Sequence, residues 1–159
     1  MELKKLENSF YIENPVVHEA LEFNSLTNEW SSQKIRGHGI VKIEIMNLIF
    51  AIPVRSNIKH RASFILEVNR ADMHVKGMGL DYSKALLITD TKYISNDIFL
   101  LSSKDAGKKL QDKEEHITKQ FSRYVEKYIS AVKKRDNNIL KSYEYRFTTL
   151  VNYHQELGL

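Results

Sequence analysis

The side chains best suited to chemistry are concentrated in the short segment 52–61. It carries three permanent cations, one imidazole, one hydroxyl and one amide: Arg55, Lys59, Arg61, His60, Ser56 and Asn57. Cations bind phosphate, neutral donors orient it, and an imidazole moves protons near neutral pH. Because the preceding strand is expected to end at Pro53, we expect a loop at a sheet edge, where rigid strands commonly present functional groups. The alternative is a solvated loop that happens to be basic.

A second candidate segment, 77–84, begins with two glycines separated by one residue, a pattern that favours a turn. Its members that could face a ligand are Asp81, Tyr82 and Lys84. The alternative is a turn in which Asp81 and Lys84 form an internally satisfied pair. The sequence contains neither GxGxxG nor GxxxxGK(S/T), the two glycine-rich motifs that bind nucleotide phosphates, so a nucleotide-binding loop is not expected.

Aromatic and polar side chains alternate near the C-terminus, across 143–154. Tyrosine, histidine and arginine stack on unpaired bases, which is how single-stranded RNA is usually read. Arg146, Asn152 and Tyr153 are therefore candidates for RNA contacts. For Tyr143 and Phe147 we favour ordinary helix packing.

The six histidines do not form a metal-binding pattern. They stand at positions 18, 38, 60, 74, 116 and 154, with no two of them three or four residues apart. Cysteine is absent from the chain, which removes thiolate ligands, thiol nucleophiles and disulfides. We therefore expect no metal site and no cofactor. His154, on a predicted apolar face, is expected to be a hydrogen-bonded core histidine.

The periodicity of the sequence predicts strands followed by helices. Alternating or continuous apolar runs indicate strands at 40–46, 49–54, 62–68 and 84–89, with a turn at Asn47-Leu48 between the first two. Apolar positions three and four apart predict helices beginning at Pro15, across 117–132 and across 147–157, the last ended by Gly158. This order indicates the α+β class, with an antiparallel sheet covered by helices from both ends of the chain.

Length and charge narrow the class of protein. The 159 residues suit a single domain spanning 1–159, and no apolar run approaches a membrane span or a secretory signal, so a cytoplasmic protein without membrane contact is expected. Residues 1–30 hold six acids and two bases, whereas the remainder holds 22 bases and 14 acids. A basic excess attracts polyanions such as nucleic acid. Two other readings remain open: a non-catalytic RNA-binding module, and a protein–protein adaptor that uses the charge asymmetry.

Four segments in order resemble a known family across residues 3–159: GIVKIEI, LIFAIPVRSNIKH, GMGLDYSKALLI and, after a long helix, YRFTTLVNYHQELG. This order is similar to that of toxins of type III toxin–antitoxin systems, most closely the TenpN group. The related ToxN/AbiQ toxins have the same layout with less similar segments.

The resemblance implies a sequence-specific, metal-independent endoribonuclease that leaves a 2′,3′-cyclic phosphate and a 5′-hydroxyl. It further implies that a pseudoknotted RNA antitoxin, cut by the toxin from a repetitive precursor, inhibits the enzyme in a toxin–RNA hetero-oligomer. The expected fold is MazF/Kid-like, a strongly twisted, SH3-barrel-like antiparallel sheet. The expected role is growth inhibition or phage defence.

The resemblance also assigns candidate site residues. The active site of ToxN-like proteins lies in a Thr-Ser-Pro-Lys loop, whose serine matches Ser56 and whose threonine position is Arg55. The proline is missing here, and Lys59 comes one position late with His60 directly after it, so either of these two is the expected catalytic base. A Tyr-x-x-x-Lys element before the first strand is matched loosely by Trp30 and Lys34, with Arg36 as an alternative for the lysine.

Overall fold

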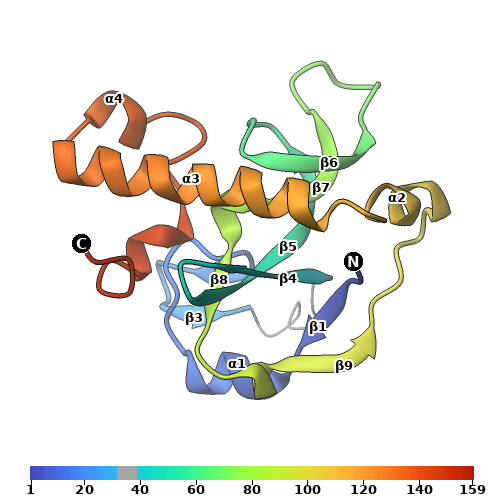
Figure 1. Ribbon diagram of the computed structural model, residues 1–159, viewed down its shortest axis with the longest axis horizontal. Coiled ribbons are helices and arrows are strands. Elements are labelled where there is room, and N and C mark those ends of the chain that lie inside the picture. The colour runs from blue at the N-terminus through green and yellow to red at the C-terminus, as the bar shows by residue number, and fades with distance from the viewer. Residues whose placement is uncertain (32–38) are drawn as a thin grey trace.

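The computed structural model describes residues 1–31 and 39–159 and has an α+β fold (Figure 1). The described residues form a seven-stranded antiparallel sheet in the order β6-β7-β5-β4-β1-β9, with β8 also pairing with β5. Its strands are β1 (Lys4–Leu6), β4 (Ile40–Ile45), β5 (Leu48–Ile58), β6 (Ser63–Val68), β7 (Gly77–Asp81), β8 (Leu86–Ile88) and β9 (Ile94–Ile98). A separate two-stranded ribbon contains β2 (Phe23–Asn24) and β3 (Glu29–Trp30).

One long helix, α3 (Glu114–Lys134), lies across the sheet (Figure 1). The shorter α-helices are α1 (Asn8–Glu13), α2 (Lys104–Lys109) and α4 (Asn137–Leu140), and 3₁₀ turns form at Tyr82–Lys84, Thr91–Tyr93 and Thr149–Asn152. None of the helices in the described part of the chain has the length and apolar character needed to cross a membrane.

The predicted hairpin is confirmed, with its turn one residue earlier than expected. Strand β4 pairs with β5 from Ile40 opposite Pro53 to Ile45 opposite Leu48. The turn residues are Met46 and Asn47, with φ of 54° and 60°. Two successive positive φ values are typical of the tight hairpin turn whose twist matches the flanking strands.

The strand predicted at 49–54 is confirmed as part of β5, but the expected end at the proline is wrong, because β5 continues to Ile58. Along one edge, β5 pairs first with β8, through residues 49–51, and then with β7, from Val54 onward. The 3₁₀ turn Tyr82–Lys84 separates β7 from β8 at the level of Pro53. The missing proline N–H therefore falls where β5 changes partners and no ladder bond is lost.

The segment expected to be a loop is instead a bulged end of β5. The register with β7 shifts between Arg55 and Ile58, and Asn57 has a φ of 57°. A bulge adds a residue to one strand and redirects the side chains around it. Ser56 and Asn57 are exposed, whereas Arg55 is half-buried.

The two glycines of 77–84 lie in strand β7, so the predicted turn there is wrong. A Cβ built at Gly79 would lie 2.1 Å from the carbonyl oxygen of Phe64, and one at Gly77 would lie 2.0 Å from that of Glu67. Only glycine permits β6 and β7 to approach this closely. The glycines therefore serve strand pairing, and β7 delivers Asp81 at its end.

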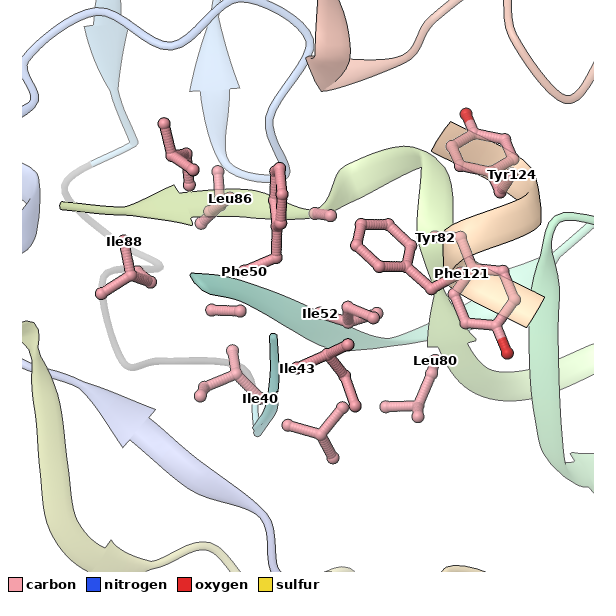
Figure 2. Close-up of a cluster of buried hydrophobic side chains, with 14 of the residues drawn as sticks. Ile40, Ile43, Phe50, Ile52, Leu80, Tyr82, Leu86, Ile88, Phe121 and Tyr124 are labelled. Atoms are coloured by element: carbon pink, nitrogen blue, oxygen red, sulfur yellow. The ribbon is translucent and has the colours of Figure 1, made fainter. Parts of the chain in front are cut away.

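The predicted helix at 117–132 is confirmed as part of α3. Its buried residues recur every three to four positions and pack on the sheet: Ile117, Phe121, Tyr124, Val125, Tyr128 and Ala131. Phe121 meets Phe50 of β5 edge to face, with ring centroids 5.2 Å apart. Figure 2 shows this contact within the cluster formed by β4, β5, β8 and α3.

The helix predicted to begin at Pro15 does not form, and α1 ends just before it. The residue before a proline is disfavoured in helical conformation. Asn14 closes α1, since its backbone N–H and its side-chain Nδ2 both donate to the carbonyl oxygen of Phe10, at 2.9 and 2.8 Å. The segment that follows is irregular, with positive φ at Glu19 and Glu22.

The continuous helix predicted at 147–157 is also wrong, and tertiary hydrogen bonds hold this segment in its irregular path against the 3₁₀ turn Tyr82–Lys84. The Thr149 hydroxyl donates to the carbonyl oxygens of Ala85 and Ser83, and the carbonyl of Phe147 accepts from Lys84. The segment contains the 3₁₀ turn Thr149–Asn152 and separate turns after Tyr153, such as the one in which the N–H of Leu157 donates to the carbonyl of Tyr153. The expected hydrogen bond of the half-buried His154 is confirmed, as its Nε2 lies 2.7 Å from the hydroxyl of Tyr128.

Candidate functional site

The Asp81 carboxylate lies at the centre of a hydrogen-bonded cluster at the end of β7. The residue is completely buried. Its Oδ2 accepts a hydrogen bond from Nη1 of Arg55 at 2.9 Å. Its Oδ1 accepts from the backbone N–H and the hydroxyl of Ser83, at 3.0 and 2.6 Å, and lies 3.1 Å from Nε2 of His60. A buried carboxylate is tolerated only when its oxygens are satisfied in this way.

The interactions of Asp81 favour its ionised form. Burial by itself raises the pKa of the Asp81 carboxyl, but the interactions with His60, Ser83 and Arg55 together lower the pKa by more. The net pKa lies below the ordinary value, so Asp81 is an anion at neutral pH.

Both ring nitrogens of His60 have partners inside the protein. Nδ1 accepts a hydrogen bond from the backbone N–H of Ala62 at 3.1 Å, which assigns the ring hydrogen to Nε2. Nε2 then donates toward Oδ1 of Asp81. The imidazole therefore links Asp81 to the start of β6, and both of its nitrogens face groups of the protein.

A cavity of about 340 Å³ lies beside this cluster, and we call it the arginine cavity. Its lining residues come from segments far apart in the sequence: Glu19, Arg55, His60, Ser83, Lys84, Tyr143 and Phe147. The side chain of Arg55 is 37 % exposed, and its contact with Asp81 uses one edge of the guanidinium. Among the described residues no other acceptor is bonded to the guanidinium, so its remaining N–H groups can donate to an anion in the cavity.

Lys84 connects the wall of the arginine cavity to both ends of the chain. Its Nζ donates to the carbonyl oxygens of Glu19 at 2.7 Å and of Phe147 at 2.8 Å. Within the described part of the chain no acceptor takes the third ammonium hydrogen. Burial lowers the pKa of Lys84, and although nearby Asp81 opposes this effect, the net pKa is below the ordinary value. Such a lysine gives up a proton more readily than a solvated one.

The rim of the arginine cavity carries two exposed aromatic rings. Tyr143 is 68 % exposed and Phe147 is 52 % exposed. The guanidinium carbon of Arg146 lies 4.2 Å from the Tyr143 ring centroid and 4.9 Å from that of Phe147. Our expectation that these two rings are packed in a helix is therefore wrong. Exposed rings beside cations are suited to stacking on nucleobases.

The four residues predicted to be catalytic divide into two pairs. Arg55 and His60 line the arginine cavity. Ser56 and Lys59 are exposed, and neither is among the lining residues. The bulge in β5 accounts for this division, because it changes the alternation of side chains beyond Arg55.

Three residues predicted to bind RNA have internal roles. Trp30 donates its indole N–H to the carbonyl of Asn14 at 2.8 Å. Asn152 exchanges two hydrogen bonds with the backbone of His18, at 3.0 and 2.8 Å. Tyr153 is 8 % exposed and belongs to the core. The Asn152 amide therefore ties the C-terminal segment to the N-terminal segment, and the Trp30 indole closes a contact within the N-terminal segment.

The other predicted RNA-binding residues have varied positions. Lys84 and Arg146 adjoin the arginine cavity, and Asp81 is buried beneath it. Asn57 is exposed on the bulge, and Arg61 and Tyr82 line a second cavity. Lys34 and Arg36 lie outside the described residues.

Sequence reasoning missed four lining residues, Glu19, Ser83, Tyr143 and Phe147. Ser83 had a local signal, since a serine two positions after an aspartate commonly returns a hydrogen bond to it. The spacing of Tyr143 and Phe147 around Arg146 was a second signal. Nothing local distinguishes Glu19, which reaches the cavity only through the tertiary fold.

The described residues contain no group of three or more histidine, aspartate or glutamate side chains placed to hold a metal ion. Comparison of the chain with family models, curated proteins and solved structures finds no match.

Proposed function

We propose that this protein is an endoribonuclease that cleaves single-stranded RNA in the arginine cavity. The observation that carries the proposal is the convergence of a guanidinium, a buried ammonium whose pKa lies below its ordinary value, and a glutamate on one small cavity lined also by exposed aromatic rings. Arg55 and Lys84 supply charge for a phosphodiester. Tyr143 and Phe147 supply faces for the adjoining bases.

RNA carries its own nucleophile, so the protein has to position the chain, transfer protons and neutralise charge. The 2′-oxygen attacks the adjacent phosphorus, and the bond from phosphorus to the 5′-oxygen breaks. Glu19 accepts the 2′-proton, Lys84 donates a proton to the departing 5′-oxygen, and Arg55 stabilises the crowded phosphorane. The products are a 2′,3′-cyclic phosphate and a 5′-hydroxyl, and proton exchange with water restores both groups.

This assignment transfers the proton chemistry from His60 or Lys59, the residues that the sequence suggested, to Glu19 and Lys84. Both nitrogens of His60 are engaged by Asp81 and Ala62. Lys59 is exposed and does not line the cavity. In this proposal His60 is a positioning residue.

The resemblance to TenpN toxins supports a wider form of the proposal. In that form the enzyme is the sequence-specific toxin of a type III system, inhibited by a pseudoknotted RNA that it processes from a repetitive precursor, and it acts in growth inhibition or phage defence. The expected fold is then the MazF/Kid-like, SH3-barrel-like sheet. In support of it, β5 pairs with β4 along one edge and with both β7 and β8 along the other.

The test is incubation of the purified chain with a defined single-stranded RNA in excess EDTA, followed by analysis of the new ends by mass spectrometry. We expect cleavage to continue in EDTA and to leave 2′,3′-cyclic phosphates, since the reaction above uses only side chains and the RNA's own hydroxyl. Loss of cleavage in EDTA, or a 3′-hydroxyl end, would contradict the proposal. Saturable binding without cleavage would identify an RNA-binding module, and no RNA binding would favour a protein–protein adaptor.

The rim aromatics give a separate prediction. Replacing Phe147 or Tyr143 with alanine should weaken single-stranded RNA binding by roughly 1–2 kcal/mol, about 5- to 30-fold, because the base that stacks on the ring loses this contact. Fluorescence anisotropy with a 2′-O-methylated, uncleavable RNA measures the change. Tyr143→Phe keeps the ring and should bind normally, and Val151→Ala removes an exposed apolar side chain of the same C-terminal segment as a control. Equal losses in Val151→Ala and Phe147→Ala would argue against stacking.

A further inference from the structure

A second cavity, of about 600 Å³, lies along α3 and α4, and we call it the helix groove. Helix α3 contributes Gln120, Arg123 and Lys127, and the connection between β5 and β6 contributes Arg61. These residues play no part in the reaction proposed for the arginine cavity.

Neighbouring residues in three chain segments line the two cavities. In each of the following pairs the first residue lines the arginine cavity and the second lines the helix groove: His60 and Arg61, Ser83 and Tyr82, Tyr143 and Ser142. Successive Cα atoms are about 3.8 Å apart, so the segments form a thin common wall. The helix groove therefore lies directly next to the arginine cavity.

The groove presents hydrogen-bond donors and positive charge. Arg123 and Lys127 are exposed and stand one helical turn apart, and Arg61 is exposed as well. Among the described residues no carboxylate pairs with any of these three cations within 4 Å. Three cations against Glu144, the one acid among the described lining residues, leave an excess suited to phosphate oxygens.

The neutral groups of the groove are already oriented. The Tyr82 hydroxyl donates to Oε1 of Gln120 at 2.6 Å, which turns the Gln120 amide so that its two hydrogens remain for a ligand. The Tyr124 hydroxyl donates to the carbonyl of Glu144 at 2.7 Å, and that of Tyr145 donates to the carbonyl of Tyr124 at 2.8 Å. The hydroxyl hydrogens of Tyr124 and Tyr145 are therefore used within the protein, and the Gln120 amide is the neutral donor that this network leaves for a ligand.

We propose that the helix groove binds the phosphate backbone of the RNA strand next to the linkage that lies in the arginine cavity. The inference rests on the proposed function, since it takes the ligand to be the same RNA. Arg61, Arg123 and Lys127 contact the phosphates, and Gln120 donates a neutral hydrogen bond. The groove makes no contact with the reacting atoms, so it contributes affinity and register and leaves the chemical step unchanged.

The test compares two double variants of α3 with equal loss of charge. Arg123→Ala/Lys127→Ala removes two groove cations, whereas Lys133→Ala/Lys134→Ala removes two exposed cations outside the groove lining. Affinity for a 2′-O-methylated single-stranded RNA is measured as a function of salt, with thermal melting as the check on folding. Because each phosphate contact contributes about 0.7 to the slope of log affinity against log salt, the groove variant should lose about 1.4 from that slope, and the control much less.

Each outcome decides a separate point. In cleavage assays the groove variant should raise KM for RNA and keep the wild-type kcat. Equal slopes in the two double variants would overturn the groove as a site, as would competition by poly-glutamate as strong as that by RNA. If the wild type cleaves no RNA, the proposed function fails, while the difference in slope still decides whether the groove binds the backbone.

Discussion

Arg55→Ala is expected to lower the rate of RNA cleavage by about 100- to 1,000-fold, the loss typical when one preorganised donor to transition-state charge is removed. Arg55 is the one arginine among the described residues that line the arginine cavity, and Asp81 fixes one edge of its guanidinium at 2.9 Å. The remaining N–H groups of the guanidinium can then donate hydrogen bonds to the phosphorane oxygens as negative charge builds on them. Single-turnover cleavage at saturating enzyme measures the chemical step apart from binding.

Two controls separate this effect from misfolding and from general loss of charge. Arg55→Lys keeps the charge but loses the forked geometry, so an intermediate rate is expected. Arg70→Ala removes an exposed arginine in the loop after β6 and should cleave at the wild-type rate. Asp81 keeps Ser83 and His60 as partners, so the folded state should persist in Arg55→Ala. A wild-type rate in Arg55→Ala would remove the arginine cavity as the active site.

Asp81→Asn is expected to destabilise the folded protein by about 3 kcal/mol, which in a protein of this size lowers the melting temperature by roughly 6–12 °C. The carboxylate is fully buried and accepts from Arg55, Ser83 and His60. An asparagine amide has one accepting oxygen in place of two. Its NH₂ group would face one of the groups that donate to Asp81, so a buried donor would lose its acceptor. Differential scanning calorimetry at neutral pH measures the loss.

The Asp81→Asn substitution should also change how the stability of the folded protein depends on pH. Because the pKa of Asp81 is lower in the folded protein than its ordinary value of 3.8, the ionised carboxylate stabilises the fold above that pH. This stabilisation is lost as the pH falls through the lowered folded-state pKa. The gap in melting temperature between wild type and Asp81→Asn should therefore narrow below about pH 4.

Asp72→Asn is the matched control for Asp81→Asn. Asp72 is exposed, and its Oδ1 accepts the backbone N–H of His74 at 2.9 Å, a turn that asparagine forms equally well. Its melting temperature at neutral pH should match that of the wild type. A loss in Asp81→Asn no larger than the loss in Asp72→Asn would show that the cluster around Asp81 does not hold the site together.

The sequence alone determined the secondary-structure elements that can be predicted from the periodicity of neighbouring residues. The alternation in IVKIEI predicted β4, and the three-and-four spacing from Ile117 to Val132 predicted α3. The composition of 52–61 also drew attention to Arg55 and His60, both of which line the arginine cavity. These features are visible locally because neighbouring residues set strand alternation and helix periodicity.

The tertiary structure decided the rest, because the contacts that build the site join distant positions. Arg55 and Asp81 are 26 residues apart, and Lys84 reaches carbonyls 65 and 63 residues away. The bond from Lys84 to the carbonyl of Phe147 also helps hold 147–157 in its irregular path. Local propensity is a weak preference, and hydrogen bonds between buried groups from separate segments override it. Which acid, lysine and aromatic rings share the cavity is therefore fixed only when the chain folds.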